Sequence, residues 1–542
     1  MMNPVPWLQM TNMISYQGLV RTFLSVYFSG YVVLLLLMYC HAKLKNISQH
    51  TVISAHLFLP DYSPMNRDSF YPAIACFSLL LMLAGCAPMH ETRQALSQQT
   101  PAAQVDTVLP TALKNGWPDS QWWLEYHDNQ LTSLINNALQ SAPDMQVAEQ
   151  RIQLAEAQAK AIATQDGLQL DFSADMERQK MSAEGLMGPF ALNDPAAGTT
   201  GPWYTNGTFG LTAGWHLDIW GKNRAEVTAR LGTVKARAAE REQTRQLLAG
   251  SVARLYWEWQ TQAALNTVLQ QIEKEQNTII ATDRQLYQNG ITSSVEGVET
   301  DINASKTRQQ LNDVAGKMKI IEARLNALTN HQTKSLKLKP VALPKVASQL
   351  PDELGYSLLA RRADLQAAHW YVESSLSTID AAKAAFYPDI NLMAFLQQDA
   401  LHLSDLFRHS AQQMGVTAGL TLPIFDSGRL NANLDIAKAE SNLSIASYNK
   451  AVVEAVNDVA RAASQVQTLA EKNQHQAQIE RDALRVVGLA QARFNAGLIA
   501  GSRVSEARIP ALRERANGLL LQGQWLDASI QLTGALGGGY KR

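Results

Sequence analysis

The chain has 542 residues, of which 46% are hydrophobic, and a formal net charge of -1 at pH 7. A charge this close to zero excludes the strong basic excess by which proteins hold nucleic-acid phosphates. The chain has 3 cysteines and none of them lies beyond Cys86, so no disulfide can brace the rest of the chain.

Residues 1–64 contain an apolar run from Phe23 to Cys40, whose length is near the minimum for a transmembrane helix. A second export signal follows at Met65, and two such signals in tandem are redundant. We therefore expect translation to begin at Met65 and residues 1–64 to be absent from the mature protein. A genuine inner-membrane anchor with a start at Met1 is the alternative, and an N-terminal peptide of the mature protein distinguishes the two.

Residues 65–85 have the pattern of a lipoprotein signal peptide. Arg67 supplies the charge, and the apolar stretch that follows is too short to span a bilayer comfortably. The string Leu83-Ala84-Gly85-Cys86 resembles the bacterial lipobox, which implies that Cys86 receives a diacylglycerol. A buried cysteine in an apolar helix is the alternative. In lipoproteins, an aspartate directly after the lipidated cysteine commonly favours retention in the inner membrane. Residue 87 is alanine here, which implies transfer to the outer membrane.

Residues 86–121 are polar and irregular, which predicts an extended tether. Organised structure is expected to begin at Trp122-Trp123. From Leu131 to Gln165 an alanine- and glutamine-rich pattern with helical spacing follows. Pro143 is expected to divide it into two helices, because proline is well tolerated at the first position of a helix.

Two strands are predicted next, because the apolar period changes to two. Apolar and polar residues alternate from Leu168 to Asp175 and again from Thr208 to Ile219, on either side of a loop rich in glycine and proline. Aromatic residues at the ends of this pair are typical of a membrane interface: Trp203, Tyr204, Trp215 and Trp220. An ordinary hairpin packed on a core is the alternative.

A helix far beyond ordinary length is predicted from Lys222 to Gln288. Apolar residues recur every three or four positions and no proline occurs before Pro340. At about 1.5 Å per residue such a helix is roughly 100 Å long. The pattern breaks at Asn289-Gly290 and resumes from Ser294 to Asn330, which predicts an antiparallel helical hairpin with its tip at Gly290.

The whole order is predicted to occur twice. Thr212-Ala213-Gly214 corresponds to Thr417-Ala418-Gly419, and the residues at the two predicted tips correspond as Tyr287, Gly290 and Ile291 to Phe494, Gly497 and Leu498. We therefore expect one repeat in residues 122–340 and a second in residues 341–542. Each repeat consists of helix, strand, loop, strand and long hairpin.

Four strands cannot close a membrane barrel, because even the smallest need about eight. Open strand edges in lipid would leave backbone groups unpaired at several kcal/mol each. Several chains must therefore contribute strands to one barrel, which predicts a homo-oligomer. The number of subunits does not follow from these considerations.

The chain resembles the outer membrane factor family, in the lipoprotein branch of TolC-like and OprM-like efflux channels. The resemblance rests on Trp122-Trp123, the Pro143-Asp144-Met145 step, the string from Ala213 to Lys222, the tip Tyr287-Gln288-Asn289-Gly290 and the ending Ala535-Leu536-Gly537-Gly538-Gly539-Tyr540. It implies a mainly α fold with a membrane β-barrel portion: a homotrimer with a twelve-stranded barrel in the outer membrane, standing on a periplasmic α-helical barrel.

The resemblance also implies the function. The protein is expected to be a passive, gated exit duct for drugs or other small toxic compounds. Its hairpin tips, with Tyr287, Gly290, Ile291, Phe494, Gly497 and Leu498, are expected to dock a periplasmic adaptor that joins an inner-membrane pump. The lipid at Cys86 would anchor the protein to outer-membrane lipid.

Relatives in this family place acidic residues six and nine positions beyond each tip glycine, at the narrowed entrance. The matching positions here are Glu296 and Glu299 in the first hairpin, and Arg503 and Glu506 in the second. A ring of carboxylates would favour cations, whereas Arg503 departs from that pattern and could clamp the closed state through ion pairs. Solvated surface charges are the alternative. We expect Arg503→Ala to increase leak conductance.

No motif supports catalysis, a cofactor or a metal site. The chain lacks Gly-x-Ser-x-Gly, His-Glu-x-x-His and a Walker loop, and histidines such as His216, His369, His402 and His409 lack ligand spacing. We therefore expect no enzyme. A lipid-tethered structural coiled-coil protein of the periplasm is the rival from another class, and type I secretion and metal-ion efflux are competing uses of the same duct.

Overall fold

The computed structural model describes residues 96–98, 116–180, 203–291, 293–330, 336–345, 358 and 360–540. All of them belong to one compact unit, Leu80–Arg542. The upstream segment 1–64, the predicted signal peptide 65–85 and Cys86 lie outside the described residues.

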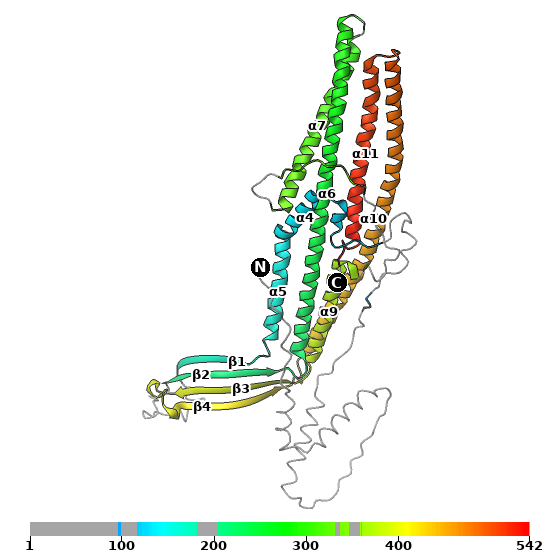
Figure 1. The fold of residues 1–542 in the computed structure, drawn as a ribbon. Coiled ribbons are helices and arrows are strands. Elements are labelled where there is room, and N and C mark those ends of the chain that lie inside the picture. The colour runs from blue at the N-terminus through cyan, green and yellow to red at the C-terminus, as the bar shows by residue number, and fades with distance from the viewer. Residues whose placement is uncertain are drawn as a thin grey trace, which may run out of the picture. The chain divides into compact units, whose positions relative to one another are not determined.

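The predicted order of elements is confirmed, and it occurs twice (Figure 1). The first half consists of η3 (Trp122–Tyr126), α4 (Asn129–Ser141), α5 (Pro143–Ala163), β1 (Gln169–Lys180), β2 (Trp203–Leu217), α6 (Lys222–Gln288) and α7 (Ser294–Leu328). The second half consists of α9 (Ala363–Ala384), β3 (Asp389–Ala400), η5 (Leu403–Asp405), η6 (His409–Ala411), β4 (Gln412–Thr421), α10 (Arg429–Asn495) and α11 (Gly501–Ala535). Pro143 is the first residue of α5, as predicted.

The strands differ from prediction at their ends. The strand predicted over Thr208–Ile219 extends from Trp203 to Leu217, so Ile219 lies outside it. The reason is local: an Asp218 carboxylate oxygen accepts a hydrogen bond from the backbone N–H of Arg224 at 2.9 Å, which caps α6 and turns the chain. Asp426 does the same before α10, where it accepts from the backbone N–H of Leu430 at 2.7 Å.

The four strands form one antiparallel sheet in the order β1-β2-β3-β4. β1 and β4 are therefore its two edges. Strands β2 and β3 come from different halves of the chain, so their pairing joins the halves. One end of every strand meets a helix, and at the opposite end of the sheet β1 ends at Lys180, β2 begins at Trp203, and β3 connects to β4 (Figure 1).

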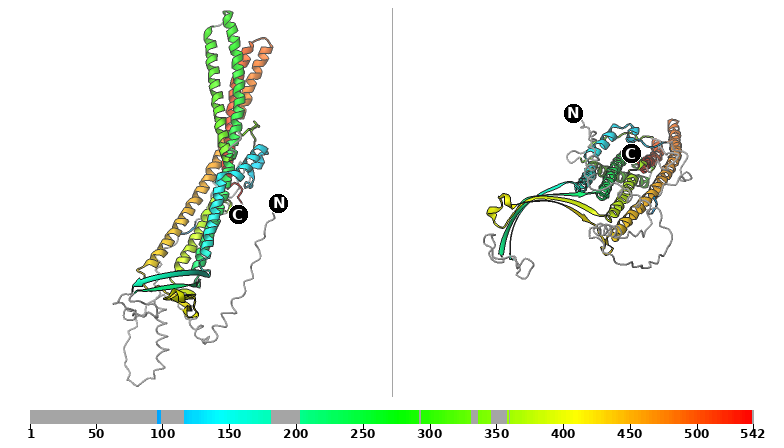
Figure 2. Two further views of the ribbon diagram at one scale, coloured as in Figure 1. Left: turned by 90° about the vertical axis from the view of Figure 1, so that its left-hand side faces the viewer. Right: turned by 90° about the horizontal axis from the view of Figure 1, so that it is seen from below.

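The helices pack side by side with their axes roughly aligned. Two shorter helices lie end to end beside each long one: α5 and α7 beside α6, and α9 and α11 beside α10. Helix α6 packs against α5 and α7 on one side and α9 and α11 on another, and α10 packs against α9 and α11 (Figures 1 and 2). The largest core lies where α4 crosses α6, with Trp123, Ile135 and Tyr256 fully buried. Within the described residues, no helix combines the length and the apolar character needed to cross a membrane.

Two extended segments lie against the helices. Residues 336–345 run between α4, α6 and α11; for example, the backbone N–H of Val341 donates to Gln260 Oε1 at 2.8 Å. Part of the predicted tether, residues 96–98, lies against α10, because Asn449 Nδ2 donates to the Ser97 carbonyl oxygen at 3.0 Å.

Candidate functional site: sheet faces, hairpin tips and entrance

The strand register gives the sheet two chemically different faces. The predominantly apolar face includes Leu170, Phe172, Ala174, Met176, Gly207, Phe209, Leu211, Ala213, Trp215, Leu217, Ile390, Leu392, Ala394, Leu396, Met414, Val416, Ala418 and Leu420, and toward its far end it also carries Thr205, Gln398 and Gln412. The opposite face is mostly polar and includes Asp171, Asp175, Glu177, Thr208, Thr212, His216, Asp389, Asn391, Asp399 and Thr417, together with Tyr204, Met393 and Phe395. On the apolar face Val416 is 80% exposed, so the described residues leave an extended apolar surface uncovered.

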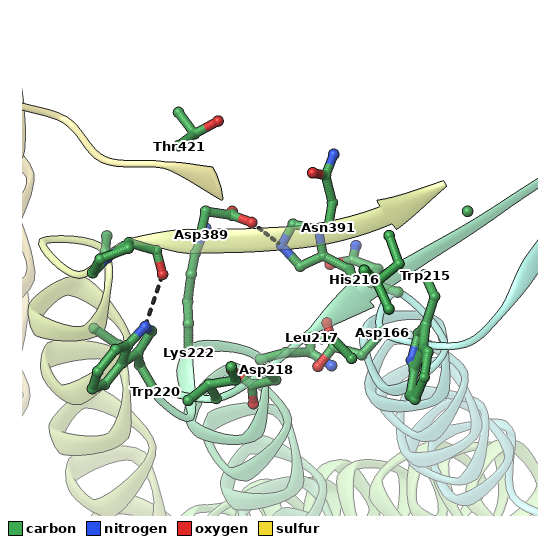
Figure 3. A pocket seen from close by; sticks show the side chains of 18 of the residues that line it. Asp166, Trp215, His216, Leu217, Asp218, Trp220, Lys222, Asp389, Asn391 and Thr421 are labelled. Atoms are coloured by element: carbon green, nitrogen blue, oxygen red, sulfur yellow. Dashed lines mark hydrogen bonds and ion pairs between the residues drawn. The ribbon is translucent and has the colours of Figure 1, made fainter. Parts of the chain in front are cut away.

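A cavity of about 700 Å³, lined by both polar and apolar side chains, lies where the sheet meets the helices (Figure 3). His216 Nε2 lies 3.0 Å from Asp389 Oδ1, and Trp220 Nε1 donates to the Pro388 carbonyl oxygen at 2.8 Å (Figure 3). The Trp220 ring stacks on Tyr387 with ring centroids 5.0 Å apart. These contacts connect the first half of the chain to the second at the base of the sheet.

No metal-binding cluster is present in the described part of the chain. Groups of three or more His, Cys, Asp or Glu side chains that could hold a metal ion are absent among those residues.

The two predicted tips are tight helix ends with exposed apolar side chains. Gly290 and Gly497 have φ of 69° and 71°, a left-handed conformation that glycine adopts without a steric cost. The N–H that follows each glycine donates across the turn, from Ile291 to the Leu286 carbonyl and from Leu498 to the Arg493 carbonyl, both at 2.9 Å. This pattern is a Schellman motif.

All six predicted tip residues lie at these two turns. Ile291 is 70% exposed and Leu498 is 73% exposed, and Tyr287 and Phe494 are exposed beside them. Each of the two turns therefore exposes an aromatic and an aliphatic side chain beside its glycine.

The predicted entrance residues lie one to two turns from the tips. Glu299 is exposed on α7, and Glu296 belongs to the same helix. Arg503 Nη1 donates to Glu506 Oε2 at 2.7 Å within α11. The hydrogen bond and charge of Glu506 raise the pKa of the Arg503 guanidinium above its usual value, with a further contribution from Asp283 on α6. In one chain, Arg503 therefore forms its ion pair within its own helix.

Arg508 is a connecting residue that the sequence reasoning missed. Its Nη1 donates to Glu275 Oε1 on α6 at 3.4 Å, and its Nη2 donates to Gln491 Oε1 on α10 at 3.1 Å. Arg508 therefore joins the second hairpin to the first near the tips. The sequence around Arg508 does not indicate this contact. Pro510, two residues later, predicts only an interruption of the helix.

Comparisons with known proteins agree with this geometry. The profile of the family described as outer membrane efflux protein matches residues 134–331 and 354–538. The multidrug resistance outer membrane protein MdtQ of Escherichia coli O6:H1 is 99% identical over 478 residues, which cover 88% of this chain and 100% of that protein. The multidrug resistance outer membrane protein MdtP of Shigella flexneri is 36% identical over 464 residues, which cover 85% of this chain and 94% of that protein.

Solved structures show the same fold. The outer membrane protein VceC of Vibrio cholerae has a TM-score of 0.66 and 25% identity, covering 78% of this chain and 100% of its own. The CmeC outer membrane channel of Campylobacter jejuni has a TM-score of 0.71 and 18% identity, covering 84% of this chain and 95% of its own. The predicted TolC-like architecture is confirmed, and the chain belongs to the outer membrane efflux protein family.

Proposed function

We propose that this chain is a passive, gated exit duct of the outer membrane, through which a tripartite efflux system releases drugs or other small toxic compounds. The observation that carries the proposal is the four-stranded sheet, with one predominantly apolar face, one mostly polar face and two open edges. An apolar outer face and a polar inner face are what a water-filled membrane barrel requires. The name of the 99% identical relative, a multidrug resistance outer membrane protein, supports drugs as the cargo.

The duct is a homotrimer in this proposal. Edge β1 of one copy pairs with edge β4 of the next, because unpaired strand edges cost several kcal/mol per group in lipid. Three copies with four strands each give a twelve-stranded barrel. The helices also support closure between copies, since α10 exposes Leu443, Val453 and Leu484 and α5 exposes Leu154.

The duct receives its cargo at the hairpin tips in this proposal. A periplasmic adaptor docks on the apolar turns at Gly290 and Gly497 and connects them to an inner-membrane pump, which supplies the energy. The chain beyond Cys86 has no cysteine, so Ile291→Cys provides a single crosslinking site. Crosslinking in cells identifies the adaptor, and with it decides between drug efflux, type I secretion and metal-ion efflux.

The lipid at Cys86 has a supporting role in this proposal. Each buried methylene contributes about 0.8 kcal/mol to membrane binding, but the barrel already fixes the protein in the membrane. We expect Cys86→Ser to lower outer-membrane yield or assembly more than conductance. Unchanged yield and efflux would argue against this role.

Two neighbouring substitutions on β4 test the barrel. Val416 lies on the apolar face and Thr417 on the polar face. An arginine on the lipid side of a barrel costs about 2–4 kcal/mol at the bilayer midplane, so Val416→Arg should reduce the heat-modifiable trimer and its outer-membrane yield. Thr417→Arg should assemble normally and shift ion selectivity in planar bilayers. Equal behaviour of the two variants, or a purified protein without conductance, would favour a structural periplasmic role instead.

A further inference from the structure

We propose that the membrane-distal end of the apolar face carries a cationic rim that binds phosphate-bearing lipid headgroups of the outer leaflet. The rim consists of Arg178 and Lys180 on β1, with Trp203 on β2. The inference rests on the proposed barrel, in which the apolar face contacts lipid. In that barrel, the strand ends farthest from the helices lie at the outer surface of the outer membrane.

The register places these cations on the outer side of the barrel. Arg178 pairs with Thr205 and Lys180 with Trp203, so both continue the row of Leu170, Phe172, Ala174 and Met176 along the apolar face. The acidic residues of the same strand, Asp175 and Glu177, alternate with them and lie on the polar face. Positive charge is therefore directed to the lipid side and negative charge to the lumen.

The height of the rim matches the headgroup level. At about 3.4 Å per residue and a strand tilt of about 40°, Arg178 lies about 26 Å and Lys180 about 31 Å along the membrane normal from the level of Trp215, an exposed aromatic residue near the helix end of the apolar face. The apolar band of such barrels is about 25 Å tall. Both cations therefore lie where hydrocarbon gives way to headgroups, beside an exposed tryptophan of the kind that favours this level.

The β3–β4 connection extends the apolar face up to the same level. A Cβ at Gly207 would lie 3.0 Å from Leu406 Cδ1 and 3.1 Å from Leu403 Cδ2, so this connection folds onto the apolar face. The Phe407 ring lies 5.6 Å from the Phe209 ring, centroid to centroid, and is 84% exposed. The apolar surface thus reaches the membrane border on β2 as well as on β1.

The two cations are available to a ligand. Arg178 and Lys180 are exposed, and among the described residues neither forms an ion pair. By contrast, Arg408 on the β3–β4 connection has its Nη1 3.1 Å from Asp405 Oδ1. Guanidinium and ammonium groups form charge-assisted hydrogen bonds with phosphate oxygens. A phosphate-bearing headgroup at this depth satisfies both cations while its acyl chains cover the apolar face.

The test measures binding of diphosphoryl lipid A to the purified full-length protein in neutral detergent, by native mass spectrometry. A basic residue near an anionic membrane surface contributes enough to change binding about fivefold. Lys180→Gln should therefore weaken binding about fivefold, and Arg178→Gln/Lys180→Gln about 25-fold. The dephosphorylated lipid should bind the unmodified protein as weakly as diphosphoryl lipid A binds the double variant. Equal binding of the two lipids would overturn the proposal.

A matched variant separates position from charge. Gln179→Lys/Lys180→Gln keeps composition and net charge but moves one cation to the polar face, and it should bind as weakly as Lys180→Gln. Affinity equal to that of the unmodified protein would overturn the rim. Trimer migration and conductance are measured on the same samples. If the unmodified protein neither migrates as a trimer nor conducts ions, the proposed barrel is refuted. If conductance is normal but lipid affinity is unchanged in every variant, only the rim is refuted.

Discussion

Removing the Arg508 guanidinium should favour the open form of the entrance. Arg508 on α11 donates to Glu275 on α6 and to Gln491 on α10, so it is a direct connection between the two hairpins near their tips. In Arg508→Ala both hydrogen bonds disappear, while the surrounding helices retain their other contacts. The hairpins then separate at a lower free-energy cost.

The magnitude follows from the exposure of the pair. The Arg508 and Glu275 side chains are 42% and 19% exposed, so their interaction is screened less than that of a surface ion pair and more than that of a buried one. Exposed pairs contribute 0–1 kcal/mol and hydrogen bonds to charged groups about 1.5–3 kcal/mol, which places this contact at about 1 kcal/mol per copy. If three copies open together, the sum of about 3 kcal/mol changes the ratio of open to closed channels roughly 150-fold.

Single-channel recording in planar bilayers measures this ratio directly. Arg513→Ala is the matched control, because Arg513 is exposed on the same helix and forms no ion pair among the described residues. The exchange Glu275→Arg/Arg508→Glu should restore part of the closed population. An open fraction in Arg508→Ala equal to that of the Arg513→Ala control would refute the reasoning.

Three further outcomes are expected. Arg503→Ala should increase leak conductance, because the Arg503 charge also attracts Asp283 on α6 across the two hairpins; an unchanged leak would make Arg503 a surface charge. Gly290→Ala should cost about 1 kcal/mol and make the tip easier to cleave by protease, since its φ is 69°, whereas Gly297→Ala within α7 should be neutral or stabilising. Burial and the hydrogen bond to Glu240 raise the pKa of Tyr371 from 10.0 to about 12. Its small contribution to stability is therefore present below pH 10 and lost as pH rises through 12. Over this range the melting temperature of the unmodified protein should fall more steeply with pH than that of Tyr371→Phe. Parallel curves of melting temperature against pH would contradict this.

The long helices and the sheet faces were predictable from the sequence, because each depends on a period repeated over many residues. Helix α6 has the predicted bounds, and Gly290 ends the hairpin arm as expected. The strand ends were less predictable. The alternation in Leu217-Asp218-Ile219 continues past the true end of β2, where the Asp218 carboxylate caps α6 instead. Strand β1 continues to Lys180 through charged residues, because β2 supplies pairing partners as far as Trp203.

Contacts between the hairpins were not predictable, because they depend on how each helix is rotated about its axis. The matching of Gly290 to Gly497 nevertheless indicates where the halves differ: Arg503 corresponds to Glu296, Arg508 to Asp301 and Pro510 to Asn303. Two of these differences reverse a charge. The third places a proline inside α11, where it removes the backbone N–H that would otherwise donate to the Glu506 carbonyl. The two hairpins of one chain are therefore not equivalent near their tips: at two matched positions they carry opposite charges, and only the second contains a proline.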